Sequence, residues 1–247
     1  MPHRTGRNPE NTSTKESYMK TKQNMYANVA TWNPQVGCKF NCIYCKPSFQ
    51  RTVNRVYHCH GARCTGCRDF TPHGHPERLS TPLPSKPIIW PCAHGDISFG
   101  DPNYIKKVID RTNGYPRKEF YWQSKNPSCF KQYLPYFPGN TILLTTLETN
   151  RNKGYNEVSR APLPSARYKA FQGLRWDRKI VTIEPILDFD PDIFLKWLIR
   201  LNPEAVWLGY NSKPRAVKLP EPSLEKTLQF VEALEAHGIE VRKKTMR

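Results

Sequence analysis

The sequence predicts an α/β protein built on a parallel sheet. Strand-like and helix-like segments alternate along most of the chain, and this alternation is typical of parallel strands joined by right-handed crossovers. The length of 247 residues suits one large domain and is common among α/β barrels. Hydrophobic residues make up 38% of the chain, which is enough to form a core.

Strands are expected where β-branched and aromatic residues cluster between turn residues. These segments are 26–32, 87–93, 119–124, 140–149, 179–189, 205–212 and 239–246. Helices are expected between them, and the pairs Asp101–Pro102 and Asp190–Pro191 each predict a helix start, with aspartate as the cap. The helical segments are 101–114, 127–137, 165–176, 190–202 and 223–238.

Two segments depart from this alternation. Residues 1–24 are polar and basic, and we expect a flexible tail there, followed by one domain over 25–247. Residues 46–87 form an insertion rich in cysteine, histidine and proline. An insertion of this length needs something to order it, and its composition points to a metal.

The chain is strongly basic. Lysine and arginine number 38 against 21 aspartate and glutamate, which gives a formal net charge of +17. This excess indicates a polyanion partner such as DNA or RNA, although a solvated basic surface is the plainer alternative. With neither a secretory signal nor an apolar run long enough to cross a bilayer, we expect a cytoplasmic protein, no membrane partner, and cysteines used for metal binding or catalysis.

The first cysteine group is Cys38, Cys42 and Cys45, which follow the first predicted strand with C-x3-C-x2-C spacing. Three such thiolates can ligate three irons of a [4Fe–4S] cluster and leave the fourth iron open to a small molecule. A structural zinc site is the alternative, but it would need a fourth ligand from elsewhere in the chain.

Cys38, Cys42, Tyr44 and Cys45 also match the C-x3-C-x-aromatic-C signature of radical S-adenosylmethionine (SAM) enzymes, and the chain resembles that superfamily from about residue 26 to 245. Within it the chain is similar to a phage-associated family of unassigned role that begins with "TWNP…GC". The segments that carry this similarity are 31–34, 75–79, 124–127, 147–150 and 183–187. The cysteine spacing and the "GYNS" strand end depart from many members of that family, and the spacing is closer to spore photoproduct lyase, a DNA-repair enzyme.

The resemblance implies a partial (β/α)6 barrel of the radical SAM type. It also implies that SAM binds the open iron of the [4Fe–4S] cluster and is cleaved reductively to a 5′-deoxyadenosyl radical, which abstracts hydrogen from a substrate. A reductase or a flavodoxin-type protein would then supply the electron.

The positions expected to hold SAM follow from the same resemblance. His94, Gly95 and Asp96 follow the second strand and would meet the SAM amino group, although Asp96 could simply cap the next segment. Thr146 and Glu148 end the fourth strand and would accept the ribose hydroxyls.

Four residues at strand ends are candidate catalytic residues. Glu184 would contact SAM or substrate, or else pair with a buried arginine. Cys92 could return hydrogen to a substrate radical, or act as a small buried hydrophobe. Lys125 and Tyr210 could read a phosphate or a base, or belong to ordinary loop surface.

The second cysteine group lies in the insertion. Cys59, Cys64 and Cys67 have C-x4-C-x2-C spacing, and we expect them to bind zinc as a Cys3His site with His60 or His73 as the fourth ligand. An auxiliary iron–sulfur cluster and unligated thiols are the alternatives. Two further histidines, His58 and His75, lie close by in the sequence.

The sequence thus favours a radical SAM enzyme that acts on nucleic acid, with aromatic side chains as stacking surfaces for bases. The aromatic residues considered for this are Tyr121, Trp122, Trp207 and Tyr210. One alternative is the same chemistry on a peptide or small molecule. The other is a non-enzymatic, metal-stabilised protein that binds nucleic acid.

Overall fold

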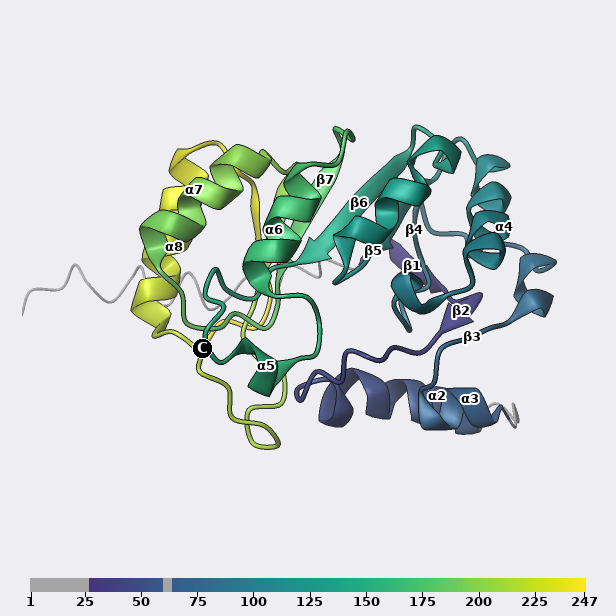
Figure 1. Cartoon of the computed structure of the whole chain (residues 1–247), viewed down its shortest axis with the longest axis horizontal. Helices are drawn as coiled ribbons and strands as arrows, with labels where there is room; N and C mark the ends of the chain where they lie inside the picture. The colour runs from purple at the N-terminus through teal and green to yellow at the C-terminus, as the bar shows by residue number, and fades with distance from the viewer. Residues whose placement is uncertain (1–26, 60–63) are drawn as a thin grey trace, which may run out of the picture.

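The computed structural model describes residues 27–59 and 64–247, and its centre is a seven-stranded sheet (Figure 1). The strands lie in the order in which they occur along the chain, and each pairs in parallel with the next. They are β1 (Val29–Trp32), β4 (Ile88–Pro91), β5 (Glu119–Gln123), β6 (Thr141–Thr146), β7 (Lys179–Ile183), β8 (Ala205–Leu208) and β9 (Val241–Lys243). The predicted α/β fold is confirmed. The sheet is a half-barrel of seven strands, one more than in the partial (β/α)6 barrel that was expected.

Helices cover the outer face of this sheet (Figure 1). They are α4 (Pro102–Asn113), α6 (Pro164–Gln172), α7 (Pro191–Leu201) and α8 (Leu224–Ala236). The helix predicted over 127–137 is not continuous: the segment forms two short 3-10 helices, η4 (Pro127–Gln132) and η5 (Leu134–Tyr136). Pro135 lacks the N–H group that would bond to the Lys131 carbonyl, so a continuous α-helix through this segment would lose that hydrogen bond.

One of the two predicted helix caps is confirmed. Asp101 accepts a hydrogen bond of 2.8 Å from the backbone N–H of Tyr104 at the start of α4. Asp190 is at the N-cap position of α7, which begins at Pro191 as predicted, but its side chain makes no capping hydrogen bond. Its carboxylate instead pairs with the Arg151 guanidinium at 2.6 Å.

Side chains point alternately to the two faces of the sheet, so two separate apolar cores form, one on each face. On β5, Phe120 and Trp122 face the helices, while Tyr121 faces the concave side with Trp207 of β8. Tyr121, Trp122 and Trp207 are at most 3% exposed, so they are core residues and not the stacking surface that the sequence suggested. The concave face changes from aromatic to polar toward the carboxyl ends of the strands. There Gln123 donates hydrogen bonds to the hydroxyls of Thr146 and Thr182.

The Cys/His-rich insertion forms a separate layer beside the β1 edge of the sheet (Figure 1). It contains η1 (Lys46–Gln50), α2 (Arg51–Cys59), α3 (Thr65–Asp69), β3 (His73–Gly74) and η2 (Pro76–Leu79). A two-stranded antiparallel pairing of β2 (Gln35–Val36) with β3 joins it to the main domain. Among the described helices, none is long and apolar enough to span a bilayer.

Candidate functional site

A cavity of about 720 Å³ lies at the carboxyl ends of the strands. This size is typical of sites for small molecules and cofactors. Because parallel strands bring their carboxyl ends to one edge, residues that follow different strands meet around this cavity. The predicted site residues that line it are Cys38, Cys42, Cys45, Cys92, Gly95, Asp96, Lys125, Thr146, Glu184 and Tyr210.

The loop that carries the first three cysteines is fixed by backbone hydrogen bonds from several sides. Gly37 donates to the His94 carbonyl at 3.1 Å and accepts from the Asp96 N–H at 3.1 Å. Gly37 has φ +94°, and a Cβ atom there would lie 2.2 Å from the Thr71 carbonyl oxygen. Only glycine therefore fits where the cysteine loop, the 94–96 loop and the insertion meet.

The three thiols suit an iron–sulfur cluster better than a single ion. They stand on one loop and line one cavity. Three thiolates match the ligands of a [4Fe–4S] cluster with one open iron, whereas a structural zinc site takes four ligands. Burial raises the pKa of the Cys45 thiol to about 11 and that of Cys38 further, so their thiolates need a bound cation to be stable here. The donor set thus fits a cluster held by three cysteines.

Lys125 connects this loop to a buried ion-pair network. Its ammonium lies 3.3 Å from the Cys42 sulfur and also contacts Glu148, which is fully buried. The Arg167 guanidinium pairs with the other Glu148 oxygen at 2.8 Å, and the Tyr44 hydroxyl donates to Glu148 at 2.6 Å. Burial alone would raise the pKa of Glu148, but Arg167 and Lys125 overcome this and hold it at about 2. Glu148 does not line the cavity and lies behind Lys125.

Asp96 lies at the cavity edge with its carboxylate already engaged. It accepts hydrogen bonds from the Ser98 and Ser124 hydroxyls, each at 2.7 Å, and from the Lys125 N–H at 2.8 Å. It also caps the 3-10 helix η3 (Ile97–Phe99), which was the plainer of the two sequence expectations. His94 does not line the cavity. Its ring packs against Phe49, and burial together with Arg78 lowers its pKa to about 4.

The four candidate catalytic residues differ in what they present to the cavity. Glu184 and Lys125 reach it with charged groups, and Glu184 pairs with Lys244 and not with an arginine. Tyr210 contributes its ring, because its hydroxyl is bonded to the Thr227 hydroxyl at 2.6 Å under α8. Cys92 is 3% exposed with φ +57°, and burial raises the pKa of its thiol to about 12.

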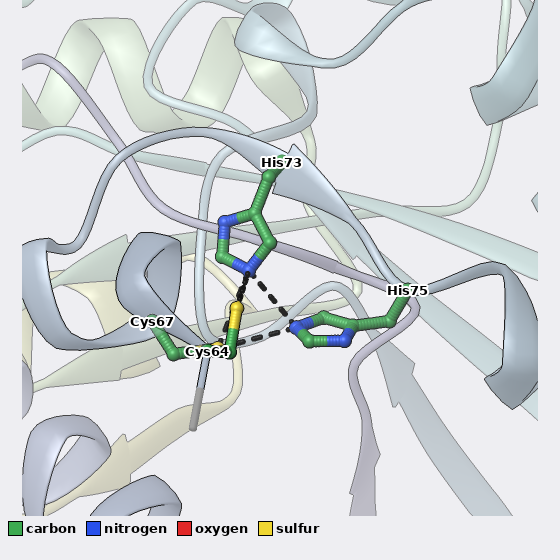
Figure 2. Close-up of side chains that lie close together, drawn as sticks. All are labelled: Cys64, Cys67, His73 and His75. Atoms are coloured by element: carbon green, nitrogen blue, oxygen red, sulfur yellow. Dashed lines mark hydrogen bonds between the residues drawn. The ribbon is translucent and has the colours of Figure 1, made fainter. Parts of the chain in front are cut away.

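The second Cys/His group is compact, and its four side chains converge on one point (Figure 2). The sulfurs of Cys64 and Cys67 lie 3.2 Å and 3.3 Å from the Nε2 atom of His73. The Nε2 atom of His75 lies 3.2 Å from the Cys67 sulfur and 2.9 Å from the His73 Nε2 atom. This arrangement of ligand atoms could hold one metal ion.

The predicted ligand set for this group is revised in one respect. Cys64, Cys67 and His73 meet as expected, but the fourth member is His75. The side chain of Cys59 and the whole of His60 lie outside the described residues. The sequence signal for His75 was its H-x-H spacing from His73, since extended backbone turns residues two apart to the same side.

Among known proteins, only solved structures match this chain. No family model and no curated protein sequence matches the chain. A double mutant of spore photoproduct lyase with bound AdoMet and dinucleoside spore photoproduct superposes with a TM-score of 0.57 at 12% identity, over 87% of this chain and 76% of that one. Spore photoproduct lyase complexed with dinucleoside spore photoproduct gives 0.56 at 12% identity, over 85% and 75%.

A third structure differs in what it binds. Streptococcus suis SuiB bound to precursor peptide SuiA gives a TM-score of 0.51 at 9% identity, over 88% of this chain and 48% of that one. The chain therefore spans about half the length of SuiB. At these identities the similarity establishes a shared fold, the half-barrel of spore photoproduct lyase.

Proposed function

We propose that this protein is a radical SAM enzyme that acts on a nucleic acid. The observation that carries the proposal is the convergence of Cys38, Cys42 and Cys45 on one cavity, at the carboxyl ends of a half-barrel shared with an AdoMet-bound lyase. When bound by three thiolates, a [4Fe–4S] cluster with an open iron supplies the electron for reductive cleavage of SAM and formation of a 5′-deoxyadenosyl radical. A reductase or flavodoxin-type donor would reduce the cluster.

The residues around the cavity have separate tasks in this proposal. Lys125 places an ammonium beside Cys42 and within reach of an anionic group in the cavity, such as the carboxylate of SAM. Glu184 presents a carboxylate acceptor toward amino and hydroxyl groups. The Thr146 hydroxyl already accepts hydrogen bonds from Gln123 and Thr182, so it can only donate to a ligand. The apolar walls formed by Phe40, Tyr44 and Trp90 keep water from a reactive intermediate.

A nucleic acid is the proposed substrate because cations and an aromatic ring flank the cavity. Lys213 lines the cavity and is exposed, and Lys46 and Arg51 are exposed where the chain leaves the cysteine loop. Phe49 also lines the cavity and is 38% exposed, so a base could stack on it. The net charge of +17 also favours binding of a polyanion such as a nucleic acid. Peptide modification is the second candidate, since SuiB shares the fold and binds a peptide.

Zinc is the metal we propose for the second Cys/His group. Two thiolates and two imidazoles form a closed structural zinc set, so no open coordination position is left for catalysis.

The proposal is tested by purifying the protein without oxygen and measuring iron, sulfide and zinc. Dithionite and SAM are then added, and 5′-deoxyadenosine is quantified. We expect about four irons and four sulfides per chain and formation of 5′-deoxyadenosine. A protein that binds neither iron nor SAM would overturn the proposal.

The proposed substrate class predicts a specific salt dependence. We expect binding to single-stranded DNA or RNA to weaken with salt, and Lys213→Ala to reduce the slope of log K against log salt by about 0.7, the contribution of one phosphate contact. The control is Lys196→Ala, an exposed lysine on α7 that does not line the cavity. Fluorescence anisotropy at several salt concentrations measures this. Equal slopes of log K against log salt for the two variants would show that Lys213 does not contact the nucleic acid. Binding that does not depend on salt would favour a peptide substrate.

A further inference from the structure

The compact Cys/His group in the insertion has a role beyond ordering its own loop. We infer that Cys64, Cys67, His73 and His75 bind one Zn²⁺ ion tetrahedrally and that this site fixes the position of the loop that carries Cys38. The second part rests on the proposed cluster, while the first part stands without it.

The geometry favours a single ion over an iron–sulfur cluster. Ligand bonds of about 2.3 Å to sulfur and 2.0 Å to nitrogen place tetrahedral ligand atoms about 3.3 to 3.8 Å apart. The four ligand atoms here lie within 4.8 Å of one another, and the closest pairs are at 2.9–3.3 Å. A two-iron cluster with two cysteines and two histidines would hold the two pairs on different irons and so farther apart. Only one ion fits among these atoms.

The outer nitrogens of both histidines are already oriented for metal binding. The Nδ1 atom of His73 lies 2.7 Å from the Thr71 carbonyl oxygen, and that of His75 lies 2.9 Å from the Glu77 carboxylate. Such contacts place the proton on Nδ1, so Nε2 carries the lone pair that can ligate a metal. Both Nε2 atoms face the two sulfurs, as Figure 2 shows.

The site is joined to the cysteine loop by backbone and by a shared core. His73 pairs with Val36 across β2 and β3, and Val36 is two residues before Cys38. The Cys38 N–H donates to the Phe70 carbonyl at 3.3 Å, three residues after Cys67. Cys67 and Val36 are fully buried in one small apolar cluster, against which both Cys38 and Cys64 pack. A shift of the zinc ligands would therefore move Cys38.

The first experiment measures zinc and iron in three forms of the full chain after anaerobic iron–sulfide reconstitution. We expect about one zinc in the wild type and in a Cys38/Cys42/Cys45→Ala variant, because that variant retains all four zinc ligands. A His73/His75→Ala variant should lose the zinc and at least half of the reconstituted iron. Absence of zinc from the wild type would overturn the zinc site. So would iron in place of zinc in the Cys38/Cys42/Cys45→Ala variant. Full iron loading without zinc would overturn its effect on the cysteine loop.

The second experiment uses a variant that preserves the fold. Glu77 is exposed and contacts the outer nitrogen of His75, so Glu77→Ala should weaken zinc binding about 10- to 100-fold in competition with a chromophoric chelator. The matched control is Asp69→Ala, which removes an exposed carboxylate that pairs with Arg68. Equal zinc affinity in the two variants would contradict the ligand role of His75. If zinc binds as predicted but the wild type takes up no iron, the proposed enzymatic function fails and the zinc site stands.

Discussion

Replacing Cys38, Cys42 and Cys45 together by alanine should abolish iron binding and 5′-deoxyadenosine formation. The three sulfurs line one cavity, and the one further cysteine that lines it among the described residues, Cys92, has no other cysteine near it in the sequence. Because each thiolate would ligate a different iron, the loss of all three leaves nothing to hold a cluster. Iron content, the visible absorbance of the cluster, and product analysis after reduction measure the effect.

The control for this variant is Cys129→Ser. Cys129 lies on η4, is half-buried and does not line the cavity. The Cys129→Ser variant should retain the iron content of the wild type and form 5′-deoxyadenosine as the wild type does. If the triple alanine variant retained iron and product, the cluster would have to lie elsewhere. The assignment of Cys38, Cys42 and Cys45 as cluster ligands, on which the proposed function depends, would then be wrong.

The second large effect concerns stability. Glu148→Gln should lower the free energy of unfolding by about 3–5 kcal/mol, because it leaves the Arg167 guanidinium buried without its anion. Both side chains of this pair are fully buried. Urea denaturation at neutral pH measures the change. Glu232→Gln, an exposed position on α8, is the control and should change the free energy by less than about 0.5 kcal/mol.

The same ion pair predicts a pH dependence. Arg167 and Lys125 lower the pKa of Glu148 from 4.5 to about 2, so the folded state favours the carboxylate. The resulting stability, roughly 3 kcal/mol, is fully present above pH 4.5 and is lost as the pH falls to about 2. The wild type should therefore lose more stability than Glu148→Gln between about pH 5 and about pH 2. Parallel stability curves for the two proteins would contradict the ion-pair account.

The strands and most helices were predictable because their signals are local. Clusters of β-branched and aromatic residues identified the strands, and Asp101 with Pro102 identified the start of α4. Asp190 has the same local signal, but Arg151, which is distant in sequence, takes its carboxylate. Local chemistry could not reveal that competition.

The candidate site was predictable to a similar degree. The spacing of Cys38, Cys42 and Cys45 indicated a cluster loop, and strand ends indicated which residues would surround a cavity. Glu148 also follows a strand, yet it faces Arg167 from α6 instead of the cavity. No local signal identifies this partner, because Arg167 stands in a short helix without a clear apolar stripe.

The sequential strand order has a consequence for the order of folding. Each strand pairs with the one made just before it, so the sheet can grow from β1 to β9 as the chain is synthesised. The cysteine loop is made early, but Ile43 bonds to the Val158 carbonyl, and the Cys42 sulfur lies 3.1 Å from the Ser159 hydroxyl. The contacts that fix this loop are therefore complete only after more than half of the chain has emerged, so cluster insertion should follow the synthesis of this later segment.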